Sequence, residues 1–124
     1  MRIACLLALV CCLSAADKPL TMDALHGAWV VDAKAVTKEQ KAAAEAAAKV
    51  DGFGLTLTLR TARAVWSEED FVAGMWRLED ATPTTATVII QPKGGEERRL
   101  HLTLEKGVMT VAESPGKLPL KNSR

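Results

Sequence analysis

Cysteine is missing from most of this 124-residue chain, because Cys5, Cys11 and Cys12 all lie within the first 16 residues. The rest of the chain therefore cannot form a disulfide, a thiolate zinc site or an iron–sulfur cluster, and it has no cysteine nucleophile. Its fold must be stabilised by an apolar core without covalent cross-links.

A surplus of charge of either sign is also lacking. The chain has 16 Lys and Arg against 15 Asp and Glu, and without Arg2 in the leading segment both counts are 15. Proteins that bind nucleic acids or anionic membranes use clustered, surplus Lys and Arg side chains. We therefore expect no nucleic-acid partner.

Motifs of hydrolases and of nucleotide-binding proteins are missing as well. No serine after residue 16 lies in a Gly-x-Ser-x-Gly turn, and Gly94-Gly95 has neither a phosphate-binding motif nor a helix after it. The serines concerned are Ser67, Ser114 and Ser123. We expect no enzymatic activity and no catalytic residues.

Metal ligands are scarce. His26 and His101 are the two histidines of the sequence, and neither has a second ligand at the close spacing of a site built from one element. Glu68-Glu69-Asp70 brings three carboxylates together, but between two predicted strands such a run is typical of a solvated turn. We expect no metal site and no other cofactor.

The first 16 residues have the pattern of a secretory signal peptide. Arg2 supplies a positive start, residues 3–13 form an apolar run, and Ser14-Ala15-Ala16 offers small residues for cleavage. The run is shorter than the roughly 18 residues of a membrane-spanning helix. We expect cleavage after Ala16, a secreted or periplasmic protein without a membrane span, and one domain over residues 17–124. The alternative is a lipoprotein that is acylated at Cys12.

Apolar residues alternate with polar ones through most of the remaining chain, which is typical of strands with one buried face. Leu55 and Leu57 flank Thr56, for example, and Leu100 and Leu102 flank His101. Short polar links separate these segments, as between antiparallel neighbours. The predicted strands are residues 27–32, 53–60, 63–67, 72–79, 85–91, 98–104, 108–113 and 118–121.

One alanine-rich segment predicts a helix. Thr37 and Gln40 form a capping-box pair, residues 38–50 follow with high helix propensity, and Asp51-Gly52 ends the helix. A helix of this length is marginal alone and must pack on the sheet. The expected contact residues are Val36, Ala43, Ala47 and Val50.

The strand pattern favours a mainly β fold, an antiparallel eight-stranded meander with one helix inserted between the first two strands. Such a meander closes into a barrel or packs as two sheets. Short strands at even spacing favour the barrel.

Gly27-Ala28-Trp29 on the first predicted strand resembles the Gly-x-Trp motif of lipocalin-like barrels, and the meander after it resembles the small secreted bacterial members of that group. The resemblance implies a helical turn near Thr21 to Leu25 and a tryptophan that closes the barrel floor. It also implies a small apolar ligand within the barrel.

We therefore expect the predicted helix to cover a ligand pocket inside the barrel. The expected lining residues are Trp29, Leu57, Trp76, Val88 and Leu102. The alternative is that these side chains fill the interior and that the protein is a structural or protein-interaction module. Its partner would then contact an exposed apolar patch around Val30 and Ile89, which point outward in the predicted strands.

Overall fold

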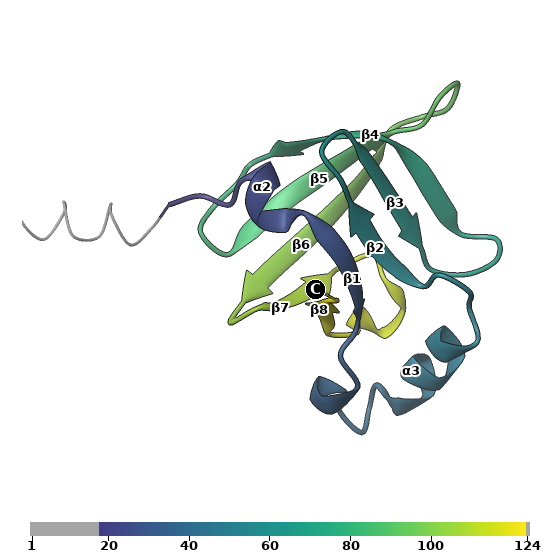
Figure 1. The fold of residues 1–124 in the computed structure, drawn as a ribbon. Coiled ribbons are helices and arrows are strands. Elements are labelled where there is room, and N and C mark those ends of the chain that lie inside the picture. The colour runs from purple at the N-terminus through teal and green to yellow at the C-terminus, as the bar shows by residue number, and fades with distance from the viewer. Residues whose placement is uncertain (1–17, 124) are drawn as a thin grey trace, which may run out of the picture.

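A computed structural model describes residues 18–123, which form a closed antiparallel barrel of eight strands (Figure 1). Each strand pairs with the next along the chain, and β8 pairs with β1 to close the barrel. This confirms the predicted eight-stranded meander. The signal peptide expected at residues 1–16 lies outside the described residues. The strands are β1 (Gly27–Val31), β2 (Gly54–Leu57), β3 (Thr61–Val65), β4 (Phe71–Glu79), β5 (Thr85–Gln91), β6 (Arg98–Glu105), β7 (Val108–Val111) and β8 (Leu120–Asn122).

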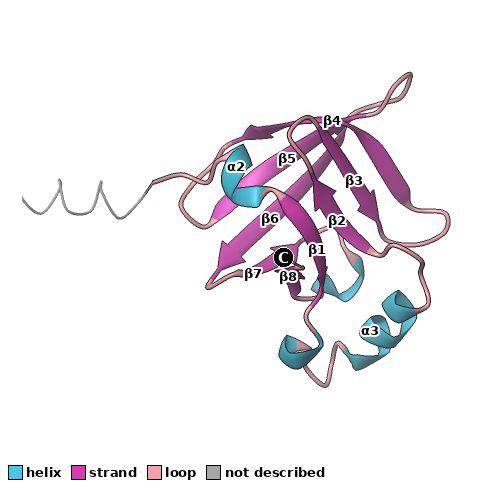
Figure 2. Cartoon of the chain, in the orientation of Figure 1, coloured by secondary structure: helices cyan, strands magenta, loops and turns pink. Residues whose placement is uncertain are grey.

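Helical segments lie at both ends of the barrel (Figure 2). They are the helices α2 (Met22–Leu25) and α3 (Lys41–Ala48) and the short 3₁₀ turns Ala33–Ala35 and Pro115–Lys117. The insertion of α3 between β1 and β2 confirms the prediction. Within residues 18–123, no helix combines the length and the apolar character needed to cross a lipid bilayer.

The predicted period of two is confirmed by the burial of alternate residues. Leu55 and Leu57 are buried on β2 while Thr56 between them is exposed. Ala62 and Ala64 face the same interior from β3. Small residues beside large ones allow a small barrel to be filled by side chains. The apolar core therefore lies inside the barrel.

The turn α2 lies against one end of the barrel. The Thr21 side chain accepts a hydrogen bond from the Ala24 N–H at 3.2 Å and caps the turn. The Trp29 indole N–H donates to the Leu25 carbonyl at 2.8 Å, and both side chains are buried. The expected helical turn next to the first tryptophan is thus present. At this same end, the Trp76 indole N–H donates to the Thr58 carbonyl at 2.9 Å.

The helix α3 lies at the opposite end and is shorter than the predicted range of residues 38–50. The Thr37 N–H donates to Gln40 Oε1 at 3.1 Å, which is one half of the predicted capping box. Residues 38–40 form a turn that precedes the helix. Of the four expected contact residues, Ala47 is buried and Val36, Ala43 and Val50 are half-buried. Val36 and Val50 line an open groove between α3 and the barrel, and Ala43 lies beside Gly116.

The apolar patch expected around Val30 and Ile89 is not exposed, and this prediction is wrong. Ile89 faces away from the barrel interior, yet its exposed fraction is 0%. Arg77 on β4 and Arg99 on β6 lie directly opposite Ile89 in the sheet, so their aliphatic stems cover it. Val30 is half-buried. Within the described range, the large apolar side chains that are exposed are Leu59 (71%), Phe71 (62%) and Met75 (64%).

Candidate ligand-binding groove

The five side chains expected to line a pocket inside the barrel are packed together in its core. Trp29, Leu57, Trp76, Val88 and Leu102 have exposed fractions between 0% and 6%, and all belong to one buried apolar cluster. None of them lines the groove described below. Their role as ligand contacts stays a prediction.

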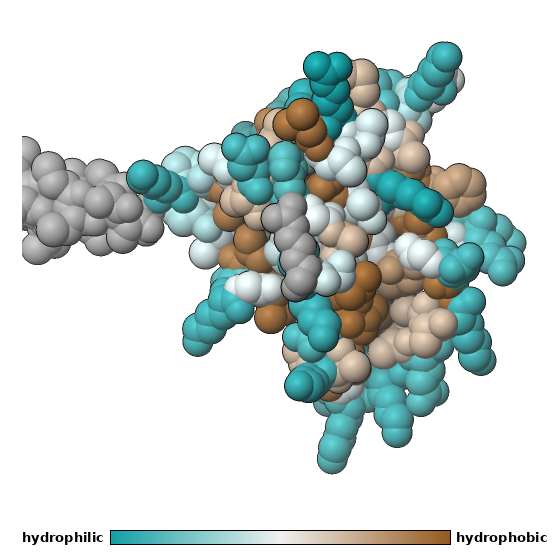
Figure 3. Space-filling model, viewed as in Figure 1, coloured by the Kyte–Doolittle hydropathy of each residue, from teal (hydrophilic) through white to brown (hydrophobic). Residues whose placement is uncertain are grey.

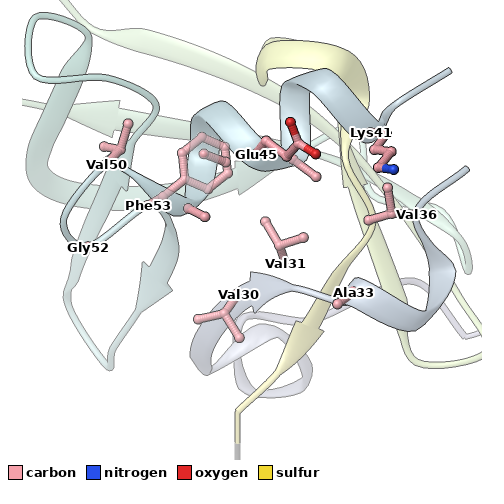
Figure 4. Close-up of a pocket in the computed structure, with 12 residues that line it drawn as sticks. Val30, Val31, Ala33, Val36, Lys41, Glu45, Val50, Gly52 and Phe53 are labelled. Carbon is pink, nitrogen blue, oxygen red and sulfur yellow. The ribbon is translucent and has the colours of Figure 1, made fainter. Parts of the chain in front are cut away.

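A groove of about 660 Å³ lies between α3 and the end of β1. Figure 4 shows Val31 projecting from β1 toward α3, with Phe53 and Val36 on either side of it. Apolar residues also gather on the surface where β1 and α3 lie (Figure 3). The lining residues are Val30, Val31, Ala33, Val36, Lys41, Ala44, Glu45, Ala47, Ala48, Val50, Gly52 and Phe53.

The composition of this lining suits an apolar ligand. Valine, alanine and phenylalanine make up most of it, and its charged residues are Lys41 and Glu45, one turn apart on α3. Ligand pockets in proteins typically have volumes of about 300–1,000 Å³ and a mainly apolar lining. The groove falls within that range in both respects.

Gln40 links the start of α3 to the far end of the chain. Its side-chain amide donates to the carbonyls of Gly116 and Lys117, both at 3.0 Å. The turn Pro115–Lys117 is also the element that α3 contacts most. The position of α3, and with it the width of the groove, therefore depends on this link.

The sequence did not single out the aromatic pair beneath the groove. Phe53 lies directly before Gly54, Trp66 lies directly after Val65, and Gly54 and Val65 are paired across β2 and β3. The two rings are in edge-to-face contact with centroids 5.5 Å apart. Phe53 lines the groove, while Trp66 is 2% exposed and belongs to the core cluster. The groove lining is thus connected to the barrel core through the contact between Phe53 and Trp66.

The Trp66 indole differs from those of Trp29 and Trp76 in its hydrogen bonding. Its Nε1 is buried and has no hydrogen-bond partner among the described residues. A buried polar group without a partner is uncommon in native proteins. The available sequence signal was the position of this tryptophan at the end of a predicted strand, in phase with Ala62 and Ala64.

A second hollow of about 290 Å³ adjoins the groove at Val50 and is more polar. Its charged residues are Lys49, Asp51, Arg63 and Glu68. The formal charges of these four residues cancel. Phe71, which is one of the exposed large apolar side chains, also lines this hollow.

The two histidines lie in different surroundings. The His26 ring packs edge-on against Trp76, with centroids 6.2 Å apart. His101 is exposed on β6, and the Glu113 carboxylate accepts from its backbone N–H and contacts its Nδ1, each at 2.7 Å. Within residues 18–123, no group of three or more His, Cys, Asp or Glu side chains could hold a metal ion.

The contact with His101 lowers the pKa of Glu113. Partial burial alone would raise the pKa of Glu113, but hydrogen bonds from the ring and backbone of His101 outweigh the burial, and the pKa lies below the ordinary glutamate value. The pair ties the end of β7 to β6.

The run Glu68-Glu69-Asp70 forms an exposed turn between β3 and β4. Ser67 Oγ accepts hydrogen bonds from the backbone N–H groups of Glu69 and Asp70 at 3.2 and 2.8 Å. The Asp70 carboxylate pairs with Arg98 at 3.2 Å. These contacts stabilise the turn.

Comparisons of this chain with protein-family models, with curated proteins and with solved structures found no match.

Proposed function

We propose that this protein is a secreted or periplasmic, lipocalin-like, non-enzymatic binding protein whose ligand is a small apolar molecule. The ligand lies in the groove between α3 and β1, outside the barrel core. The observation that carries this proposal is the groove of about 660 Å³ with its valine, alanine and phenylalanine lining. Contact with apolar surface on both sides removes most of a small ligand from water, which is the main driving force for binding.

The filled core supports the choice of the groove over the barrel interior. The interior side chains pack against one another with almost no exposed surface. A ligand inside the barrel would have to displace them and lose their packing. The groove requires no such displacement.

Fluorescence titration with N-phenyl-1-naphthylamine, a neutral apolar dye, tests the proposal. We expect saturable binding with one dye per chain and a rise in the unfolding temperature, since a ligand selective for the folded state stabilises it. Ala44→Phe fills the groove from α3 and should weaken binding by about tenfold, equivalent to a loss of about 1.4 kcal/mol.

Ala46→Phe is the matched control, because Ala46 is exposed on α3 and does not line the groove. It should bind the dye as the unmodified protein does. The proposal is overturned if the dye does not saturate, or if the two variants weaken binding equally.

A second candidate is a protein-interaction module that uses the barrel wall. Phe71 and Met75 project outward from β4 and are mostly exposed. A contiguous exposed apolar surface often marks a protein contact. If the double substitution Phe71→Ser and Met75→Ser abolishes dye binding while Ala44→Phe leaves it unchanged, the wall and not the groove is the apolar binding surface.

A further inference from the structure

The Trp66 indole is the one indole of the described chain whose N–H has no acceptor. The Trp29 and Trp76 indoles donate to backbone carbonyls at 2.8 and 2.9 Å. Leaving a buried donor without a partner costs free energy, because the donor has lost its hydrogen bond to water. An acceptor brought by a ligand would remove that cost.

Trp66 lies next to the groove, because its ring contacts a residue of the groove lining. Its backbone is held by the hydrogen bond from its N–H to the Asp70 carbonyl at 2.9 Å. Its ring lies against Phe53, which belongs to the groove lining. The Phe53 ring therefore contacts both the Trp66 indole and the groove.

Phe53 stands between two glycines, which leaves its ring without side chains on neighbouring residues. Gly52 and Gly54 have φ values of +76° and +135°, a region that residues with a side chain rarely adopt. A side chain at position 54 would overlap the Trp29 carbonyl. The backbone beside Phe53 is therefore held close to β1 at Gly54, and its half-buried ring is the part of the residue that lines the groove.

From these observations we propose that the groove ligand is an apolar molecule with a carbonyl oxygen, and that this oxygen accepts a hydrogen bond from the Trp66 indole N–H. The apolar body lies between α3 and β1, and the Phe53 ring moves aside to admit the oxygen. Trp66 then determines specificity between ligands of equal size. This inference rests on the proposed function and adds the chemical class of the ligand to it.

Competition of 2-nonanone and nonane with N-phenyl-1-naphthylamine tests the inference, because these probes have the same chain length and differ by one carbonyl. Trp66→Phe removes the donor and keeps an aromatic ring. We expect this substitution to weaken the binding of 2-nonanone by about fivefold, as for the loss of one neutral hydrogen bond. The affinity for nonane should stay nearly unchanged. An equal loss for both probes, or no loss for either, overturns the inference.

A measurement on the unmodified protein covers the case in which Trp66→Phe does not fold. The indole N–H signal of Trp66, assigned through its proximity to the Phe53 ring, should move downfield with 2-nonanone and not with nonane. The indole signals of Trp29 and Trp76 are internal controls and should stay in place, because both donors already have acceptors. Identical responses of the Trp66 signal to the two probes overturn the inference. Failure of nonane and of the dye to bind overturns the proposed function as well.

Discussion

Ile89 on β5 lies directly opposite Arg77 on β4, and this outward-facing isoleucine is completely shielded from solvent. Arg99 faces it from the other side on β6. Both guanidinium groups are held in place by ion pairs of 3.2–3.4 Å with the same two carboxylates, those of Glu79 and Glu97. These ion pairs hold the aliphatic parts of both arginine side chains over Ile89. Ile89 is therefore buried although it lies on the outer face of the barrel.

Ile89→Ala should therefore destabilise the protein as a core substitution does, by about 2–4 kcal/mol, because it leaves a cavity beneath the arginines. Met75→Ala is the matched comparison, since Met75 also faces outward but is mostly exposed, and it should change stability by no more than about 0.5 kcal/mol. Urea denaturation of both variants measures the difference. Equal effects would mean that the arginine stems do not shield Ile89.

The contact of His101 with Glu113 predicts a pH dependence of stability. A carboxylate whose pKa is lower in the folded state than in the unfolded state stabilises the fold fully above the unfolded value and loses this effect as the pH falls through the folded value. For Glu113 the loss begins as the pH approaches the ordinary value of 4.5 from above and continues below it. Glu113→Gln should remove this part of the acid sensitivity in denaturation curves measured between neutral and acidic pH.

His101→Ala tests the origin of the same shift. The ring contact is lost while the backbone N–H of residue 101 still donates to the carboxylate, so the pKa of Glu113 should rise part of the way toward its ordinary value. The titration of the Glu113 carboxyl carbon signal, followed by NMR, reports this directly. A pKa that is the same with and without the ring would show that the backbone hydrogen bond alone lowers it.

The strand pattern was predictable because leucines two residues apart share one face, as Leu55 and Leu57 do in the barrel. The groove was not predictable, since an alanine-rich helix has the same sequence whether it packs closely on a sheet or lies apart from it. The lining role of Phe53 was hidden for a similar reason. Phe53 begins the predicted strand 53–60, directly after the glycine that ends the predicted helix, and this position indicates a strand residue and not a groove residue.

Strand ends were predicted less well where a turn lacks glycine. Residues 53–60 and 63–67 were expected as strands, but β2 ends at Leu57 and β3 begins at Thr61. The turn is closed by Thr58, whose backbone N–H donates to the Thr61 carbonyl at 2.8 Å and whose hydroxyl contacts that of Thr61 at 2.7 Å. Residues 118–121 were also expected as a strand, and β8 begins two residues later. Here the preceding turn Pro115–Lys117 does contain a glycine, and Pro119 precedes the strand.

The same threonine arrangement closes the turn between β4 and β5, so it is a recurring signal in this chain. The Thr82 N–H donates to the Thr85 carbonyl at 2.8 Å, and the two hydroxyls are 2.6 Å apart. The Thr82 hydroxyl also accepts from the backbone N–H groups of Thr84 and Thr85 at 3.3 and 2.9 Å. Threonine three residues before threonine, between alternating segments, thus marks a hairpin here without glycine.

Thr82→Val should cost about 0.5–1.5 kcal/mol of stability, because valine keeps the shape of threonine and the backbone hydrogen bond but removes the hydrogen bonds of the hydroxyl group. Thr84→Val is the control in the same exposed turn, since the Thr84 side chain makes no hydrogen bond within residues 18–123, and its effect should stay within about 0.5 kcal/mol. Thermal or urea denaturation compares the two variants. If Thr84→Val is as destabilising as Thr82→Val, the hydroxyl contacts do not stabilise the turn.

The side-chain oxygen and nitrogen of Gln40 have separate roles. Gln40→Glu keeps an oxygen to accept from the Thr37 N–H but replaces the amide that donates to the carbonyls of Gly116 and Lys117. Helix α3 has only eight residues, too few for stability on its own. Loss of the link should therefore let α3 open locally, with faster amide hydrogen exchange in α3 than in the barrel strands.

The affinity for the dye should fall as amide exchange in α3 becomes faster, since α3 forms one side of the groove. The global free energy of unfolding should fall by only about 1 kcal/mol. Thr37→Val is the control: it removes a side-chain contact of 3.3 Å with Gln40 and leaves both donations from the Gln40 amide intact. Unchanged exchange in α3 after Gln40→Glu would mean that packing of Ala47 against the barrel, and not the amide, holds the helix over the groove. If exchange accelerates and dye binding does not weaken, the helix is not part of the binding surface.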